Sequence, residues 1–421
     1  MNKKVVKRII GGLIALLVIV ATFISGFFTA KNYYLTNELE SIKFIIDTYK
    51  KYYYQEQENL PHLFADALMD EYSQFYTEEE YKLSEKASKG YRQALGISVN
   101  DELVISKVLY NSPADNAGIK TGGKIMLLDG VEVTNKTQLE NINANQEITL
   151  TISYADGNKN FTLQKAEFTE TFVMYYDNTT EYSFSSASQE ITAQEKAQNI
   201  YNLDDKTGYL IYRGFSAINS TPERTWKDDL STSAGQFAYA LKKFNEKGKT
   251  NLIIDLRDNG GGYMTILSSV VSHFIEGTSR ALISEARYKG EKTERFYSLA
   301  PCREEYNFEK ITVLCNQNTA SASEAFVGAL LDYDDENVVE VVVEYNPSRK
   351  NYSSFGKGIM QSTVVNTITN QALKLTVAEI YWPISDISIH GKGVSTQVSS
   401  KVKESKNSLG EPIDALDYVL N

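Results

Sequence analysis

The hydrophobic pattern between Ile311 and Leu331 changes from a continuous apolar run to a helical repeat. The run Ile311–Cys315 predicts a buried strand, and Ala325–Leu331 predicts a helix. The polar residues between them then form a short strand-to-helix turn. Strands joined to helices in this way build α/β sheets, so this stretch favours an α/β core.

Ser321 lies in that turn, within the sequence Thr319-Ala-Ser-Ala-Ser-Glu324. A serine at the start of a helix can expose its hydroxyl near backbone N–H groups that have no intrahelical partner. Such a place suits a nucleophile, because unpaired N–H groups can stabilise negative charge. However, Ser321 and Glu324 also have the spacing of a capping box. Taken alone, the turn favours an ordinary helix cap.

A second strand-to-helix unit lies upstream. Asn251–Arg257 predicts a buried strand, Asp258–Gly262 a glycine-rich turn, and Met264–Phe274 a helix. The turn lacks the sequence patterns of phosphate-binding loops, which argues against that function. Consecutive glycines can adopt positive φ and present N–H groups to an anion, as in an oxyanion hole. A tight connection without a ligand explains the same residues, and the turn alone favours it.

A serine nucleophile needs a base. The chain has three histidines, His62, His273 and His390, and none has a sequence context that assigns it to Ser321. The sequence therefore gives little support to a Ser-His-Asp triad.

Lysine can replace histidine as the base when burial lowers its pKa toward neutrality. Lys357 lies between two glycines at the start of a predicted strand. Residues four apart in a strand point to the same face, so Gln361 is expected beside Lys357. Its amide oxygen can orient the amine without charging it, whereas a carboxylate there would keep the lysine protonated.

The N-terminus has basic residues followed by the apolar run Ile9–Phe28. Twenty apolar residues can cross a bilayer as a helix, and the basic flank predicts a cytoplasmic N-terminus. A cleaved signal peptide is the alternative, but the run is long and Phe28–Ala30 is a poor cleavage site. Residues 1–31 are therefore predicted to be a transmembrane anchor. Residues 32–91 predict a helical arm that serves as a stalk or for dimerisation.

Composition limits the remaining classes of function. A net charge of −11 argues against a nucleic-acid-binding surface. Hydrophobic (42%) and charged (23%) fractions are those of globular domains. No Cys/His cluster has metal-ligand spacing, so neither a metal nor another cofactor is predicted. Cys315 reads as a core residue, and a disulfide with Cys302 is an open alternative outside the cell.

Residues 92–168 are predicted to form short strands, and they resemble a PDZ domain. The matching segments are Leu95-Gly96-Ile97, Ser112-Pro113-Ala114, Ala117-Gly118-Ile119 and Asp129-Gly130-Val131. The resemblance implies that a peptide adds a strand to the sheet while backbone N–H groups hold its C-terminal carboxylate. The implied peptide-binding loop consists of Gln93, Ala94, Leu95, Gly96 and Ile97. Arg92 either adds positive charge to this loop or is a solvated surface side chain.

Three further motifs follow in order: Asp255-Leu-Arg-Asp-Asn-Gly-Gly-Gly262, Ser321-Ala-Ser-Glu324 and Phe355-Gly-Lys-Gly-Ile-Met-Gln361. With the PDZ segment before them, they resemble the carboxyl-terminal processing proteases (tail-specific proteases), which use a Ser-Lys dyad. Gly260 stands where that family usually has proline. The interval between Ser321 and Lys357 is longer than usual, and the extra residues fall in Tyr345–Ser354.

The resemblance implies a crotonase/ClpP-like α/β protease core over residues 169–421. It makes Ser321 the nucleophile, Lys357 the base and Gln361 the residue that orients the lysine. Gly261 and Ala322 would donate backbone N–H groups to the oxyanion.

The sequence thus predicts a membrane-anchored serine endopeptidase with an extracytoplasmic body. Its partners would be proteins or peptides with an accessible C-terminus, and a second copy of the chain bound through the helical arm. The main alternative is a catalytically inactive or gated PDZ binding protein of the same fold. A crotonase-like enzyme acting on acyl thioesters is a remote third interpretation, based on fold analogy alone.

Overall fold

The computed structural model describes residues 39–52, 59–109, 111–144, 146–187, 190–197, 201–217, 229–275, 279–299, 306 and 308–421. The chain divides into two units, residues 1–67 and 68–421, and each is described by itself. The predicted anchor Ile9–Phe28 lies outside the described residues. None of the helices within the described ranges is long and apolar enough to cross a membrane.

The first unit is helical in its described part. Residues 39–52 form a helix, and α2 spans Leu60–Leu68. Apolar side chains such as Phe44 and Ile45 are largely exposed on the first helix. These helices agree with the predicted arm, and the homodimer expected through it stays a prediction.

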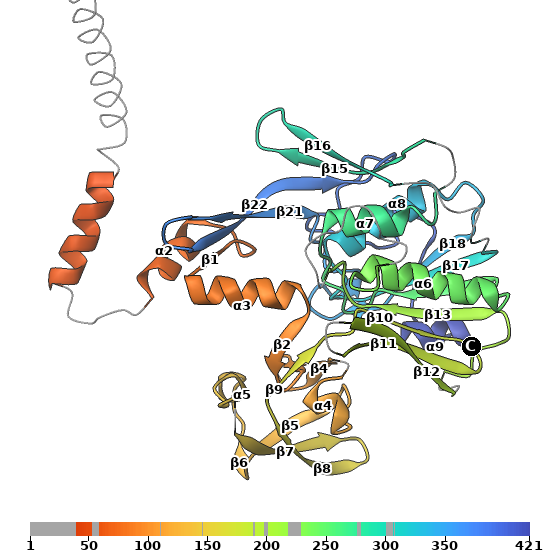
Figure 1. Ribbon diagram of the computed structural model, residues 1–421, viewed down its shortest axis with the longest axis horizontal. Helices are drawn as coiled ribbons and strands as arrows, with labels where there is room; N and C mark the ends of the chain where they lie inside the picture. The colour runs from red at the N-terminus through yellow and green to blue at the C-terminus, as the bar shows by residue number, and fades with distance from the viewer. Residues whose placement is uncertain are drawn as a thin grey trace, which may run out of the picture. The chain divides into compact units, whose positions relative to one another are not determined.

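An eight-stranded sheet forms the centre of the second unit (Figure 1). Five neighbouring strands, from β13 to β23, run parallel, and the three strands at the other edge are antiparallel. The order across the sheet is β12 (Glu190–Ala197), β11 (Thr180–Ala187), β10 (Val173–Tyr176), β13 (Thr207–Tyr212), β14 (Asn251–Asp255), β17 (Lys310–Cys315), β18 (Val339–Val343) and β23 (Val402–Glu404).

Helices cover both faces of this sheet because its strands are apolar on both sides. One face packs against α6 (Ser233–Glu246), α7 (Met264–Val271) and α8 (Ala322–Asp332) in the main hydrophobic core. The other face packs against α9 (Ala415–Leu420) through a smaller cluster that includes Tyr209 and Ile253. The predicted strand–turn–helix units and the α/β core are therefore confirmed.

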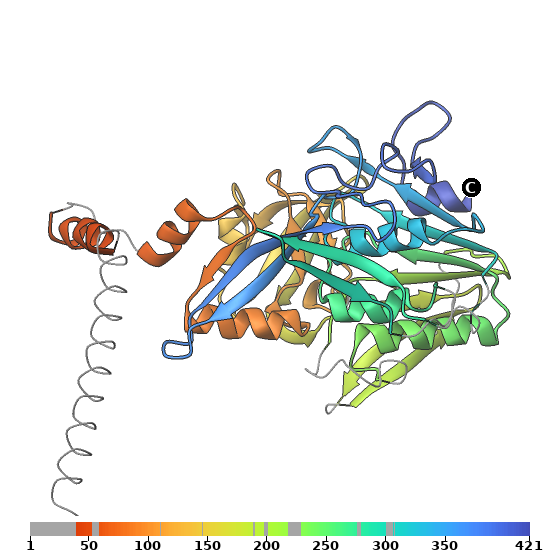
Figure 2. The ribbon, with the colours of Figure 1, turned by 90° about the horizontal axis from the view of Figure 1, so that it is seen from above.

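A second sheet packs beside the core. Its long strands are β21 (Ile359–Val365) and β22 (Ala372–Tyr381), drawn in blue beside the teal β15 in Figure 2. The other members are β1 (Gln74–Tyr76), β15 (Leu282–Tyr288) and β16 (Thr293–Tyr297). The purely helical prediction for residues 32–90 is wrong at β1, because pairing with β22 decides its conformation. A three-residue strand has too little local pattern to be seen in the sequence.

The PDZ segment has its own hydrophobic core, which includes the fully buried Ile119, Ile125 and Leu150. Its elements are β3 (Ile97–Val99), β4 (Ile105–Val108), α4 (Pro113–Asn116), β5 (Lys124–Leu128), β6 (Val131–Glu132), α5 (Thr137–Glu140), β7 (Glu147–Tyr154) and β8 (Gly157–Gln164). A two-stranded ribbon, β2 (Tyr91–Ala94) with β9 (Ala166–Thr169), flanks this segment in the sequence on both sides. Helix α3 (Glu78–Ser88) precedes it and begins with a capping box formed by Thr77 and Glu80.

The structure shows the state of Cys315 and the conformation of the extra residues before Lys357. Cys315 is a free, buried thiol in β17, whereas Cys302 lies outside the described residues. The extra residues Tyr345–Ser354 contain a small hairpin of β19 (Tyr345–Asn346) and β20 (Asn351–Tyr352).

Helix α8 packs so tightly that substitution of Gly328 tests the core. A Cβ at this position would overlap the buried indole ring of Trp382. We expect Gly328→Ala to destabilise the protein by about 1–3 kcal/mol through overpacking. In an open helix the same change would stabilise by about 1 kcal/mol, because alanine has the higher helix propensity. Denaturant unfolding measures the sign, and a stabilised variant would contradict this packing.

Candidate active site

The two predicted turns meet because β14 and β17 are neighbouring parallel strands. The carboxyl ends of parallel strands open at the same edge of a sheet, and ligands generally bind there. The glycine-rich turn follows β14, and the turn with Ser321 follows β17. The fold therefore brings Gly261 next to Ser321, although the two residues are 60 positions apart (321 − 261) in the sequence.

Ser321 has a strained backbone, with φ 59° and ψ −119°, immediately before α8. A residue with a side chain seldom adopts positive φ, and such strain concentrates at functional sites. The helix begins with the predicted capping box, in which the Glu324 side chain accepts the Ser321 N–H at 3.0 Å. The Glu324 N–H also donates to the Ser321 carbonyl oxygen at 2.9 Å. The cap is therefore real, and it is the strained backbone of Ser321 that favours a nucleophile in addition to the cap.

Gly261 touches the serine turn directly. Its φ is 98°, and a Cβ there would lie 2.8 Å from Ala320 O, Ala322 N and Ser321 Cβ. Only glycine permits both the conformation and the close approach.

The two predicted oxyanion donors are in different states. The N–H of Gly261 donates to the side-chain oxygen of Asn259 at 3.0 Å, so it is already occupied. The N–H of Ala322 makes no hydrogen bond to another part of the chain that the structure describes. Asn259 is fully buried, and its side-chain nitrogen donates to Tyr212 O at 2.8 Å. The Gly261 N–H can therefore serve an oxyanion only after Asn259 gives it up.

Lys357 lies just before β21 rather than inside it, and its Nζ donates to Gln361 Oε1 at 2.7 Å. Burial lowers the pKa of Lys357, and the nearby charge of Lys374 lowers it further. The structure thus brings together a desolvated lysine and a neutral acceptor. Burial favours the uncharged amine that a general base requires, and the amide oxygen holds the ammonium proton less strongly than a carboxylate would.

Tyr72 also lies beside this lysine, and no pattern in the sequence predicted its role. Gln361 Nε2 donates to the carbonyl oxygen of Tyr72, which fixes which amide atom faces the lysine. The Tyr72 ring centroid lies 5.5 Å from Lys357 Nζ. Tyr72 and Gln361 are 289 positions apart in the sequence. The pairing of β1 with β22 brings them together.

Glu324 links the serine to the lysine segment. Its Oε2 accepts the backbone N–H of Ser321 at 3.0 Å and that of Lys357 at 2.9 Å. Its Oε1 accepts the Ser354 hydroxyl at 2.5 Å and the Gly356 N–H at 2.7 Å. The side chain is completely buried, and burial raises its pKa to about 7. The sequence indicated Glu324 only as a member of a capping box and of the motif Ser321-Ala-Ser-Glu324, not as a link to the lysine segment.

A cavity of about 1160 Å³ is lined by Ser321, Ala322, Gly261, Lys357 and Gln361. No hydrogen bond joins Ser321 to Lys357 in the described part of the chain, although both residues line the same cavity. None of the three histidines is among the residues that line it. Nor do the described ranges contain a group of three or more His, Cys, Asp or Glu placed to hold a metal ion.

The predicted peptide-binding loop runs from the end of β2 into β3: Gln93 and Ala94 belong to β2, Leu95 is buried, Gly96 has φ 87° and Ile97 opens β3. Among the described strands β3 pairs only with β4, so its other edge is available for strand addition.

Two PDZ side chains, Ser98 on β3 and Lys107 on β4, line the cavity that holds Ser321. Arg92 forms an ion pair with the buried Glu170 at 2.9 Å. It is therefore neither a solvated side chain nor a free charge for the peptide.

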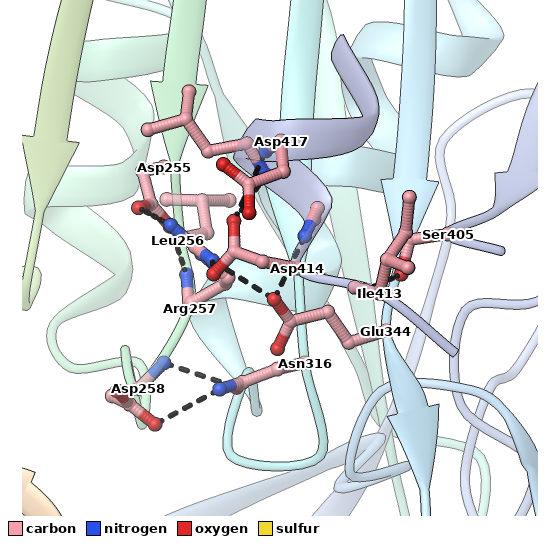
Figure 3. A network of polar contacts seen from close by, with 12 residues as sticks. Asp255, Leu256, Arg257, Asp258, Asn316, Glu344, Ser405, Ile413, Asp414 and Asp417 are labelled. Atoms are coloured by element: carbon pink, nitrogen blue, oxygen red, sulfur yellow. Dashed lines mark hydrogen bonds and ion pairs between the residues drawn. The ribbon is translucent and has the colours of Figure 1, made fainter. Parts of the chain in front are cut away.

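An arginine-centred network anchors the start of the glycine-rich turn (Figure 3). Arg257 pairs with Asp255 at 2.8 Å, with Glu344 at 2.8 Å and with Asp414 at 2.7 Å. Burial alone would raise the pKa of Asp255, but the charge and hydrogen bonds of Arg257, together with Arg213 and the Tyr209 hydroxyl, lower it. Asp414 caps α9, so the network ties the glycine-rich turn to the C-terminal helix.

Comparison with protein families agrees with this geometry. Residues 206–400 match the model of peptidase family S41, and residues 84–153 match the PDZ domain. A segment similar to the PDZ domain therefore precedes a segment similar to peptidase family S41. These matches bear out the resemblance to the carboxyl-terminal processing proteases.

Relatives and solved structures are similar over most of this chain. A "Probable CtpA-like serine protease" of Staphylococcus aureus (strain COL) is 24% identical over 378 residues, covering 86% of this chain and 64% of the relative. The protein of the same name from Staphylococcus epidermidis is 24% identical, covering 86% of this chain and 65% of the relative. The photosystem II D1 C-terminal processing protease matches with a TM-score of 0.48 and 18% identity, covering 83% of this chain and 84% of that one.

Replacement of Glu324 by glutamine tests whether its carboxylate holds the Ser321 turn and the Lys357 segment together. Four donors face the carboxylate, and an amide offers only one accepting oxygen. We expect Glu324→Gln to lose at least two of the four hydrogen bonds, at about 1–3 kcal/mol for each buried donor left unsatisfied.

The pH dependence of stability separates this role from a general packing defect. The native pKa of Glu324 is raised to about 7. Its contribution to stability is therefore complete below its ordinary pKa near 4.3 and is lost as the pH rises through about 7. Denaturant unfolding from pH 4 to 8 should show this slope in the wild type and lose it in Glu324→Gln. An identical slope in both proteins would contradict the assignment.

Proposed function

We propose that the chain is a serine endopeptidase in which Ser321 is the nucleophile and Lys357 the general base. The observation that carries this proposal is the bridge made by Glu324, which holds the backbones of both residues on one buried carboxylate. Around that bridge lie a strained serine, a desolvated lysine and a glycine turn, all bordering one cavity.

In the first step, neutral Lys357 Nζ would take the proton of the Ser321 hydroxyl while Oγ attacks the carbonyl carbon of the peptide bond. The negative charge then develops on the carbonyl oxygen. The Ala322 N–H can stabilise it, joined by Gly261 N–H once Asn259 releases that group. Removal of one such donor typically lowers kcat by about 100- to 1000-fold.

In the second step, the lysine ammonium would return its proton to the leaving amine, and an acyl-enzyme remains on Ser321. Lys357, neutral again, would then deprotonate a water molecule that attacks the ester. Gln361 orients the amine throughout without adding charge, because its oxygen accepts from Nζ while its nitrogen is tied to Tyr72.

The PDZ domain would select the substrate by its C-terminus. The free edge of β3 can pair with an extended peptide, and the loop Gln93–Ile97 can bind the carboxylate through its backbone.

We further propose that Ile9–Phe28 anchors the protein in the cell membrane, with its body outside the cytoplasm. Resistance of the full-length chain to extraction from membranes at alkaline pH tests the anchor, and its release would refute it.

A gated or inactive binding protein remains the second candidate function. Two observations favour a resting state: Asn259 occupies the Gly261 N–H, and Ser321 is not hydrogen-bonded to Lys357. A gated enzyme and an inactive one differ in whether any substrate elicits cleavage.

The central prediction is that cleavage depends on Ser321. The full-length chain in detergent should cleave an unfolded reporter with an apolar C-terminal tail, and Ser321→Ala should not. Both proteins should bind the tail with similar affinity, because the PDZ loop is unchanged. The same reporter with an amidated C-terminus controls for carboxylate recognition.

Equal cleavage by wild type and Ser321→Ala would refute the proposed nucleophile. Tail binding without cleavage by either protein would favour the binding-protein alternative.

The second prediction concerns the charge of the base. Activity should rise with pH as Lys357 loses its proton. Because the pKa of Lys357 is lowered, the rise should occur below the ordinary lysine pKa of about 10.4. In Gln361→Glu a carboxylate would face the ammonium and raise its pKa by about 1–3 units. The rise in kcat/KM should therefore move to higher pH by that amount.

Gln361→Met is the matched control, since it removes the acceptor without adding charge. It should lower activity by loosening the lysine, with no comparable upward movement of the pH profile. An unchanged profile in Gln361→Glu would mean that Lys357 is not the titrating base.

A further inference from the structure

Lys374 lies on β22 directly opposite Thr363 of β21. Directly paired residues of antiparallel strands share one face of the sheet, and residues two apart along a strand share it as well. Lys374 is therefore on the same face as Gln361, and all three residues line the cavity that contains Ser321. Its four-carbon side chain can bring a positive charge close to the proposed catalytic pair.

Three other cations that line the cavity have partners. Arg92 is paired with Glu170 at 2.9 Å, and Arg213 lies 3.6 Å from Asp258. Lys107 Nζ donates to the backbone carbonyl of Asp258. Among the residues that the structure describes, no acid lies within ion-pair distance of Lys374.

Lys374 is also half-buried, and burial lowers its pKa. A desolvated ammonium without a counter-ion is costly unless it acquires a partner. A negatively charged group of a ligand bound in this cavity would supply such a partner.

We propose that the ammonium group of Lys374 binds a carboxylate of the polypeptide substrate and makes cleavage favour an acidic group near the scissile bond. This inference rests on the proposed endopeptidase function. It makes Lys374 a specificity-determining residue that acts alongside the PDZ domain, because the PDZ loop reads the distant C-terminus and Lys374 reads the cleavage site.

The carboxylate has two sources: an Asp or Glu side chain, or the C-terminal carboxylate of a short substrate. Both offer the same acceptor for Lys374. The first requires an acidic residue at a fixed distance from the cleaved bond, and the second requires a chain that ends at that distance.

The experiment measures kcat/KM of the full-length chain on peptides with one cleavage site. One set carries a single glutamate at each of the three positions on either side of the site, and the matched set carries glutamine. A third set ends within three residues after the site, with a free or an amidated C-terminus. We expect about tenfold preference for the carboxylate at one position in one of these sets.

Lys374→Met should abolish that preference, and Lys374→Arg should retain most of it. Lys89→Met is the matched control, because Lys89 also lines the cavity and its removal should leave the preference intact. A preference that is absent in the wild type, or equal in wild type and Lys374→Met, would overturn the proposal.

The pH profile gives a second readout that a merely structural role would not move. Lys374 lowers the pKa of Lys357 by charge repulsion. Its removal should therefore raise that pKa and shift the rise of kcat/KM on neutral peptides to higher pH, whereas Lys374→Arg should not.

Failure of the proposed function can be distinguished from failure of this inference. If the wild type cleaves neither neutral nor acidic peptides, the endopeptidase proposal fails. The affinity of the same glutamate and glutamine peptides, measured by fluorescence anisotropy, then still decides whether Lys374 binds a carboxylate. Equal affinities in wild type and Lys374→Met would overturn it.

Discussion

The site depends on one buried carboxylate. Ser321 and Lys357 belong to different segments and make no hydrogen bond to each other in the described structure, yet Glu324 accepts the backbone N–H of both. Burial of a carboxylate is costly, as its raised pKa shows, and its four hydrogen bonds are what make the position tolerable. Because each bond ends on the main chain or on Ser354, the carboxylate fixes where the two segments lie and leaves their side chains to chemistry.

The sheet supplies the frame for this link. Parallel pairing of β14 with β17 puts the glycine-rich turn beside the serine turn, and Asn259 joins them, since its carbonyl accepts the Ala320 N–H and the Ser323 hydroxyl at 3.0 Å each. Arg257 holds the same turn from the side of α9 (Figure 3). The turn is thus held firmly where it begins. At Gly261 the backbone N–H makes one hydrogen bond to the Asn259 side chain, and an oxyanion could replace that acceptor.

Much of this could be predicted from the sequence, because the evidence is local. Strand–turn–helix periodicity predicts both turns, and the four-residue spacing puts Gln361 beside Lys357. The sequence could not predict the Tyr72 carbonyl, because main-chain acceptors leave no trace in side-chain identity and β1 is too short to show a pattern. It could not predict the state of Gly261 either, since a hydrogen bond to Asn259 two residues away depends on the conformation of the turn. Arg92 was left open between two interpretations, and the ion pair with Glu170 excluded both.

The placement of charge explains how a lysine can be a base beside a buried acid. Glu324 touches Lys357 only at its backbone N–H, whereas Nζ faces the neutral oxygen of Gln361. A carboxylate in contact with Nζ would hold the proton on the amine and prevent it from accepting one from serine. Burial and the like charge of Lys374 both act in the opposite direction. Glu324 therefore positions the two segments, Gln361 orients the amine of Lys357, and Lys374 lowers the pKa of that amine. Each of these functions requires a different distance from Lys357 Nζ.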